Sequence, residues 1–121
     1  MLVVDDDAFM RDLISTTLLA IGVIEVKAVG CGQDALDLLK GSGADFNLLM
    51  SDLYMPDMDG IEFLDYVKES GFDGDIVLFS GVNRKILDQA GKLATAKQIK
   101  ILGCLEKPIS QEDLKNLLIQ G

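Results

Sequence analysis

The middle of the chain reads Asn47-Leu48-Leu49-Met50-Ser51-Asp52, an apolar run that stops at an acid. A short apolar run without polar alternation is typical of a strand that is covered on both faces, as in a parallel sheet. Working outward from it, four further segments read as strands, at residues 2–4, 23–29, 75–79 and 99–105. The chain therefore has five candidate strands spread over its whole length.

Apolar residues recur at helical spacing after each of these strands. Met10 to Ile21 forms the first such stripe, with Asp7 as its expected N-cap and Gly22 as its end. Ser110 and Asp113 resemble a capping box at the start of the last helix. A second helix is expected around Ala35–Leu39, ended by Gly41 and Gly43, and a third over Ile61–Val67, closed near Gly71. A fourth is expected to be capped by Asn83 and to run to Lys97, with Ile86, Ala90, Leu93 and Ala94 inward. The inward face of the last helix is expected to be Leu114, Leu117 and Leu118.

Five units of strand followed by helix predict one α/β domain, a parallel sheet with helices on both faces. In such a sheet the functional site lies beyond the carboxyl ends of the strands. Polar side chains stand at these ends: Asp5 and Asp6 after the first strand, Asp52 after the third, Ser80 after the fourth and Lys107 after the fifth. The fold therefore predicts that they meet at one edge.

The three acids at this edge need a counter-charge. Two carboxylates about 4 Å apart repel by roughly 4 kcal/mol at an effective dielectric constant near 20. A few oxygen ligands suit Mg²⁺, which keeps several of its waters. A carboxylate nucleophile, Mg²⁺, the Lys107 ammonium and the Ser80 hydroxyl together are the groups that phosphoryl transfer to Asp52 requires.

Composition narrows the classes of partner. The chain has 121 residues, a net charge of -9 and no histidine. The negative charge argues against a surface for nucleic acid or anionic membranes, and no apolar run is long enough to span a membrane. The two cysteines, Cys31 and Cys104, match no zinc or redox spacing, and no secretory signal is visible, so we expect a reduced, cytoplasmic chain.

Other motifs in the chain do not support a competing kind of site. Asp57-Met58-Asp59-Gly60 is similar to part of a calcium loop, but the loop's end positions would be Met55 and Tyr66, which cannot ligate. A turn set by Pro56, with Gly60 relieving the backbone, is the better interpretation. No phosphate-binding glycine motif follows the first strand, which argues against a dinucleotide-binding fold. Tyr54 stands where a haloacid-dehalogenase-type phosphatase has its second aspartate, which argues against that class of enzyme.

Four stretches resemble the signature motifs of response-regulator receiver domains of bacterial-type two-component systems (CheY-like domains). They are Val3–Asp7, Ser51–Gly60, Phe79–Gly81 and Glu106–Ile109. The resemblance covers essentially the whole chain. It implies a flavodoxin-like, doubly wound (βα)5 fold with a five-stranded parallel sheet in the order 2-1-3-4-5.

The resemblance also implies a role for each residue of the edge. Asp52 is the phosphoacceptor. Asp6 ligates Mg²⁺ directly, Asp5 does so largely through water, and the backbone carbonyl of Tyr54 is a further ligand. No other enzymatic activity is implied beyond this self-catalysed transfer.

Two residues would bind the transferred group. Ser80 bonds a phosphoryl oxygen and moves on switching, and Lys107 pairs with the phosphoryl group, with a typically cis bond to Pro108. The donor would be a sensor histidine kinase or phosphotransfer protein, which fits a chain without histidine. A homodimer could form on activation, and the output would be a domain after Gly121 or a partner protein, in which case residues 1–121 are a fragment of a longer regulator.

Two departures from the family pattern stand out. Cys104 occupies the position that usually carries an aromatic switch residue, so an aromatic toggle is in doubt. The stretch between Ser80 and Lys107 is longer than in minimal members and resembles receivers joined to EAL-type cyclic-di-GMP phosphodiesterases. The alternative function is a pseudo-receiver, a protein-interaction module of the same fold that is not phosphorylated.

Overall fold

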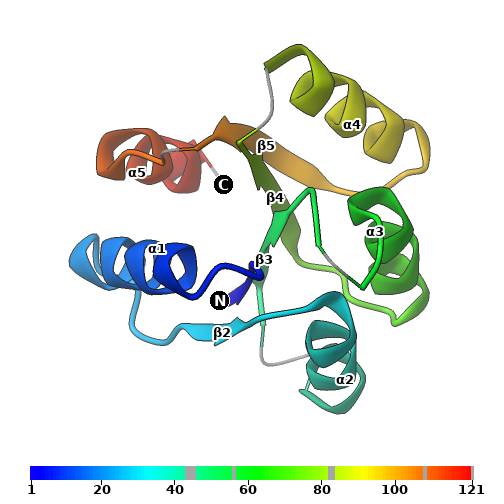
Figure 1. Cartoon of the computed structure of the whole chain (residues 1–121), viewed down its shortest axis with the longest axis horizontal. Coiled ribbons are helices and arrows are strands. Elements are labelled where there is room, and N and C mark those ends of the chain that lie inside the picture. The colour runs from blue at the N-terminus through cyan, green and yellow to red at the C-terminus, as the bar shows by residue number, and fades with distance from the viewer. Residues whose placement is uncertain (43–45, 56, 82–83, 108, 121) are drawn as a thin grey trace.

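The computed structural model describes residues 1–42, 46–55, 57–81, 84–107 and 109–120. Strands and helices alternate along this described part (Figure 1). Their bounds are β1 (Leu2–Val4), α1 (Ala8–Ala20), β2 (Lys27–Val29), α2 (Gly32–Ser42), β3 (Leu48–Asp52), α3 (Gly60–Glu69), β4 (Asp75–Ser80), α4 (Arg84–Ala96), β5 (Ile101–Glu106) and α5 (Gln111–Gln120). The strands form one parallel sheet in the order β2-β1-β3-β4-β5, which confirms the predicted fold class and strand order.

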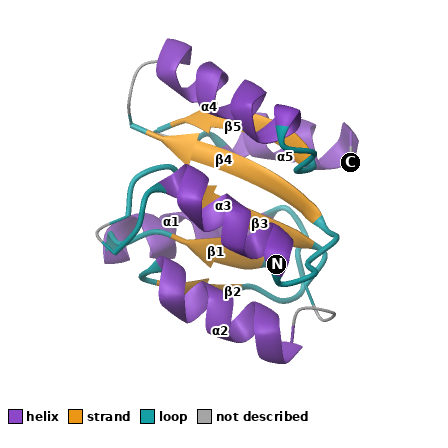
Figure 2. Ribbon diagram, turned by 90° about the vertical axis from the view of Figure 1, so that its right-hand side faces the viewer, coloured by secondary structure: helices purple, strands orange, loops and turns teal. Residues whose placement is uncertain are grey.

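Helices cover both faces of the sheet. Helices α1 and α5 lie on one face and α2, α3 and α4 on the other, as Figure 1 shows along the sheet and Figure 2 from the side. Alternate strand residues divide accordingly: Val3, Met50 and Val77 pack with the α1–α5 side, whereas Leu2 and Leu49 pack with the α2–α4 side. All five of these side chains are fully buried, so each face has its own hydrophobic core.

The expected helix boundaries are confirmed where they depend on a capping residue or glycine at the end of the helix itself. The Asp7 carboxylate accepts a hydrogen bond of 2.9 Å from the Phe9 N–H and caps α1. The Ser110 hydroxyl oxygen accepts one of 3.0 Å from the Asp113 N–H at the start of α5. Gly22, just after α1, has a φ of 103°, a conformation that a side chain would strain.

Two boundary predictions were wrong. Strand β2 is only Lys27–Val29 and not 23–29, because its one neighbour, β1, offers three residues for pairing. Helix α2 begins at Gly32 and continues through Gly41, which does not end it. The expected roles of Gly43, Pro56, Asn83 and Pro108 lie outside the described residues.

The buried face of α4 also differs from the prediction. Ile86 and Leu93, expected inward, are 41% and 48% exposed, and Leu87 is buried instead; the inward position of Ala94 is confirmed. The reason is the close approach of α4 to β5, where a methyl group on Gly91 would lie 2.9 Å from the Sγ of Cys104. The helix turns its smallest residue to the sheet, and that rotation carries two large apolar side chains outward.

Strand β5 begins at Ile101, later than the predicted start at Ile99, which is buried just before it. The pairing with β4 shifts between Ile101 and Gly103, so Leu102 is an extra residue in β5. This bulge explains the interruption at Gly103. No described helix is long and apolar enough to cross a membrane.

Candidate functional site

The sheet brings the predicted site residues together. Asp5 and Asp6 follow β1, Asp52 ends β3, Ser80 ends β4 and Lys107 follows β5. Because all strands are parallel, these positions share one edge. Asp6, Asp52, Ser80 and Lys107, together with Tyr54, Met55 and Gly81, line a depression of about 410 Å³ at this edge. The depression is open to a ligand, whereas Asp5 lies fully buried beneath it.

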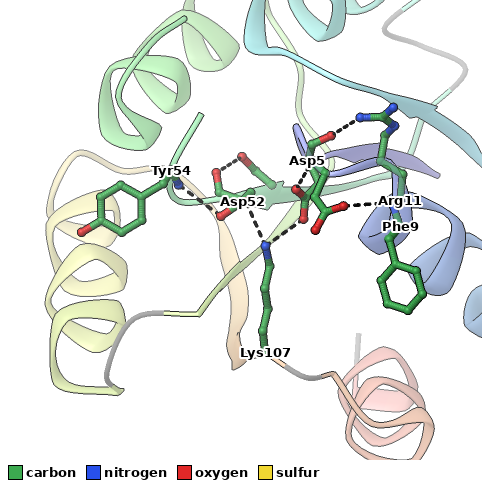
Figure 3. A network of polar contacts seen from close by, with 8 residues as sticks. Asp5, Phe9, Arg11, Asp52, Tyr54 and Lys107 are labelled. Carbon is green, nitrogen blue, oxygen red and sulfur yellow. Dashed lines mark hydrogen bonds and ion pairs between the residues drawn. The ribbon is translucent and has the colours of Figure 1, made fainter. Parts of the chain in front are cut away.

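Asp52 is held from two sides. Its Oδ1 accepts a hydrogen bond of 3.1 Å from the Tyr54 N–H, and its Oδ2 lies 3.0 Å from the Lys107 ammonium (Figure 3). Asp52 is only 4% exposed. The carboxylate is therefore fixed in orientation, with one oxygen held by a backbone N–H and the other by the Lys107 ammonium.

Asp5 is bonded on one oxygen and left incomplete on the other. Its Oδ1 accepts a hydrogen bond of 2.9 Å from the Asp7 N–H. Its Oδ2 lies 2.9 Å from the Lys107 ammonium, but the contact is an ion pair without the directionality of a hydrogen bond, and no described group supplies one. This buried oxygen thus has an ion-pair contact but no hydrogen bond, and a metal ion would be a further partner for it.

The acids form a group suited to a metal ion. One carboxylate oxygen from each of Asp5, Asp6 and Asp52 can lie within 4.8 Å of the others. Asp6 is exposed while the other two are buried, so the group opens toward solvent. An all-oxygen, acidic donor set of this size fits a hard divalent cation such as Mg²⁺.

Burial and neighbouring charges have opposing effects on the pKa values of Asp52 and Lys107. Burial raises the pKa of Asp52, the Tyr54 N–H and Lys107 lower it in part, and the neighbouring Asp5 raises it further. Burial disfavours the charged form of Lys107, but the close contacts with Asp5 and Asp52 and their negative charges outweigh it and raise the pKa of Lys107. Negative charge is thus in excess, and the single ammonium does not fully offset it.

Lys107 is positioned by its own backbone. The Lys107 N–H donates a hydrogen bond of 2.8 Å to the Ser80 carbonyl, and its ammonium stands 5.4 Å from the centre of the Phe79 ring. A cation over an aromatic face is attracted by the ring. Ser80 is 1% exposed, and its place at the end of β4 puts it against the depression.

The loop after Asp52 is closed by a glycine. The Gly60 N–H donates to the Leu53 carbonyl at 3.1 Å, and a methyl group on Gly60 would lie 2.3 Å from that oxygen. Asp59 then caps α3 by accepting from the Ile61 N–H. Gly60 therefore has the backbone role that the sequence suggested.

Three contributors to the site were not predicted. Phe79 lies beneath the Lys107 ammonium. Arg11, on α1, donates a hydrogen bond of 2.8 Å to the Asp5 carbonyl. The Asp57 carboxylate accepts hydrogen bonds from the N–H groups at the start of α2. Arg11 could have been found, since it lies one to two turns after the acids on the first helix. No sequence signal pairs Asp57 with a helix that begins 25 residues earlier.

Cys104 presents a small, half-buried thiol. Its Sγ faces Gly91 of α4, and burial raises the pKa of this thiol. A groove of about 420 Å³ lies between α4 and β5, lined by Cys104, Ile101 and Thr95 among others. The Arg84 guanidinium donates a hydrogen bond of 2.8 Å to the Cys104 carbonyl.

Comparison with known proteins agrees with this architecture. The family model of the response regulator receiver domain matches residues 1–119. The chain belongs to this family. Among solved structures, this receiver domain is similar to chemotaxis protein CheY4 of Vibrio cholerae, with 30% identity, a TM-score of 0.80 and coverage of 98% of this chain and 94% of that one. A receiver domain protein of Methanospirillum hungatei has a TM-score of 0.82 at 22% identity, covering 98% and 89%, and supports the fold alone.

Two curated relatives are considerably longer than this chain. The receiver is 33% identical over 120 residues to a protein-glutamate methylesterase/protein-glutamine glutaminase of Clostridium acetobutylicum, covering 98% of this chain and 34% of that protein. It is 28% identical over 116 residues to the Regulator of RpoS of Escherichia coli K12, covering 96% and 32%. The chain thus spans about a third of the length of these relatives, and it is a receiver domain of two-component signalling.

Proposed function

We propose that this receiver accepts a phosphoryl group on Asp52 from a sensor histidine kinase or phosphotransfer protein, with Mg²⁺ bound, and thereby switches an output domain or partner. The observation that carries the proposal is the pairing of Asp52 with Lys107 beside a buried, incompletely bonded Asp5. Asp52 is the one carboxylate of the site that is both nearly buried and reachable from the depression.

The cation would be held by Asp5, Asp6, Asp52 and the backbone carbonyl of Tyr54. When bound, Mg²⁺ supplies positive charge to the oxygens of the phosphoryl group. The chemistry of the donors supports this assignment, since three acids converge where one ammonium is present.

The residues of the chain then have separate tasks. Asp52 forms the new oxygen–phosphorus bond as the donor's bond from phosphorus to the imidazole nitrogen breaks, and the imidazole leaves with that electron pair. Tyr54 N–H holds the non-attacking oxygen in place. Lys107 leaves its ion pair with Asp52 to bind a phosphoryl oxygen, and the Ser80 hydroxyl donates to another.

The switch would follow from these new bonds. Ser80 ends β4 and its carbonyl binds the backbone of Lys107, so a shift of either residue is transmitted to the β4–β5 pair. New contacts worth a few kcal/mol are enough to change which of two conformations dominates. With Cys104 in place of an aromatic ring, the readout would depend on Ser80 and the adjoining loop.

The location, oligomeric state and output of the protein are also part of the proposal. We propose a cytoplasmic signalling protein whose receiver does not bind nucleic acid or membranes, with a homodimer forming on activation. The motif around Ser80 and the stretch before Lys107 favour an EAL-type cyclic-di-GMP phosphodiesterase as output.

The test is incubation with Mg²⁺ and acetyl phosphate, followed by intact-mass measurement. We expect one added phosphoryl group that is stable in acid and labile in base. Asp52→Asn should abolish it, while Asp73→Asn, a change in the exposed turn at the opposite edge of the sheet, should not. Labelling that persists in Asp52→Asn would move the acceptor elsewhere, and absence of labelling in the wild type would identify a pseudo-receiver.

A further inference from the structure

The turn between β2 and α2, Gly30–Gly32, touches both loops that carry the proposed metal ligands. One loop follows β1 and holds Asp5 and Asp6, and the other follows β3 and holds Tyr54. Each loop reaches the turn through one charged side chain that lies outside the acidic group, Arg11 in the first case and Asp57 in the second.

Arg11 connects the first loop to the turn. Its Nη1 donates a hydrogen bond of 2.8 Å to the carbonyl of Asp5, which is the peptide that joins Asp5 to Asp6 (Figure 3). A methyl group on Gly30 would lie 3.0 Å from the same nitrogen, so the guanidinium is packed directly against the turn. The Asp5 N–H is bound to Val29 at 3.2 Å. The backbone of Asp5 is thus held on both sides, its N–H by the Val29 carbonyl and its carbonyl, which begins the Asp5–Asp6 peptide, by Arg11.

Asp57 connects the second loop to the same turn. Its two carboxylate oxygens accept hydrogen bonds from the N–H groups of Gly32 at 3.1 Å and Gln33 at 3.0 Å, the first residues of α2. These N–H groups have no partner within the helix, and the helix end favours a negative charge. Met58 packs on Gly32 so closely that a methyl group there would lie 2.8 Å from its sulfur.

We propose that Arg11 and Asp57 are positioning residues for the Mg²⁺ site, and that the Gly30–Gly32 turn holds the two metal-binding loops in register. Neither residue would contact the ion. Each would set the geometry of a ligand through the backbone, and partners of this kind commonly change metal affinity by about 10- to 100-fold when they are removed. The inference rests on the proposed function, because it assumes that Mg²⁺ binds at the acidic group.

Charge and position make opposite predictions for Arg11. Removing a positive charge near three acids would, by charge alone, tighten Mg²⁺ binding. Loss of positioning would weaken it. Arg11→Met removes charge and hydrogen bonds, whereas Arg11→Lys keeps the charge but loses the planar fork that reaches the carbonyl. We expect both variants to bind Mg²⁺ about tenfold more weakly than the wild type.

Asp57 has a matched control in Asp34, an exposed acid in the first turn of the same helix. Asp57→Ala and Asp34→Ala each remove one negative charge near the start of α2, but only the first releases the loop. We expect about tenfold weaker binding for Asp57→Ala and less than about a twofold change for Asp34→Ala.

The experiment is calorimetric Mg²⁺ titration of the unphosphorylated protein, with urea unfolding of each variant in the absence of Mg²⁺. A merely structural role would lower stability and leave the affinity of the folded protein unchanged, which would overturn the inference. Tighter binding in Arg11→Met with unchanged binding in Arg11→Lys would also overturn it, in favour of charge alone. A wild type that binds no Mg²⁺ would overturn the proposed function itself, and the inference with it.

Discussion

The ammonium of Lys107 lies 3.0 Å from Oδ2 of Asp52 and 2.9 Å from Oδ2 of Asp5, so one cation bridges two buried acids. The side chain of Asp5 is fully buried, and that of Lys107 is 20% exposed. Bonds in this setting are strong because water screens them little, and a partner left alone is costly. The bridge stabilises the site until a metal ion or phosphoryl group takes over its role.

Lys107→Met should therefore destabilise the protein without Mg²⁺ by about 3 kcal/mol, since it leaves uncompensated buried charge. Mg²⁺ should restore much of this loss, so the gain in the free energy of unfolding on adding Mg²⁺ should be larger in the variant than in the wild type. Urea unfolding with and without Mg²⁺ measures both. Lys115→Met, an exposed change on α5, should shift stability by less than about 0.5 kcal/mol. Equal effects of the two variants would contradict the bridging role.

Asp52→Asn should stabilise the Mg²⁺-free protein at pH 7. The fold raises the pKa of Asp52, chiefly through burial, so the folded state holds this proton more tightly than the unfolded state does. The contribution of Asp52 is then most favourable below its ordinary pKa and is lost as pH rises through its raised pKa. The stability difference between variant and wild type should grow with pH across that interval. Urea unfolding as a function of pH checks this, and a variant less stable than the wild type at pH 7 would contradict it.

Gly60→Ala should destabilise the protein by about 3 kcal/mol, because its methyl group would press on the Leu53 carbonyl, a backbone atom that cannot move aside. Gly41→Ala is the matched comparison. Gly41 lies in α2 with nothing within 4 Å of an added methyl group, so this change should stabilise the helix by about 0.5 kcal/mol. Thermal unfolding should give opposite signs for the two changes, and the same sign in both would show that the Leu53–Gly60 closure is not rigid.

The site could be predicted from the sequence because it depends on topology more than on detail. Asp5, Asp52 and Ser80 each follow an apolar run, and parallel strands bring such positions to one edge whatever their exact packing. The caps at Asp7 and Ser110 were also predictable, since they act on residues two or three positions away.

Contacts between distant segments were not predictable. The α4 sequence contains two overlapping apolar stripes, and the one that is buried is decided by the fit of Gly91 against Cys104 across the chain. Strand β2 was overestimated because its length is set by its neighbour β1 and not by its own apolar residues. The contact between Asp57 and Gly32 was not predicted for the same reason, because it joins segments that are far apart in the sequence.

Cys104 offers a probe of the switch. Burial raises the pKa of its thiol, so in a Cys31→Ser background its alkylation at pH 7 should be slower than that of a free cysteine. If phosphorylation moves β5 relative to α4, the rate should change. Ser80→Ala should abolish this change while sparing incorporation of phosphate, because it removes only the hydroxyl that responds to the phosphoryl group. Iodoacetamide labelling measures the rate, and a normal response in Ser80→Ala would show that Ser80 has no part in switching.

Tyr54 is expected to protect the acyl phosphate from water. Its side chain is 53% exposed, lines the depression and follows Asp52 by two residues, with its N–H bound to the same carboxylate. Hydrolysis needs a water molecule to approach phosphorus opposite Asp52, and a ring beside that path limits access. Tyr54→Ala should therefore lose its phosphoryl group several-fold faster than the wild type after the donor is removed. Tyr66→Ala, which removes a ring that is 43% exposed on α3, should match the wild-type lifetime. Equal lifetimes in Tyr54→Ala and wild type would mean that water reaches phosphorus by a path the ring does not cover.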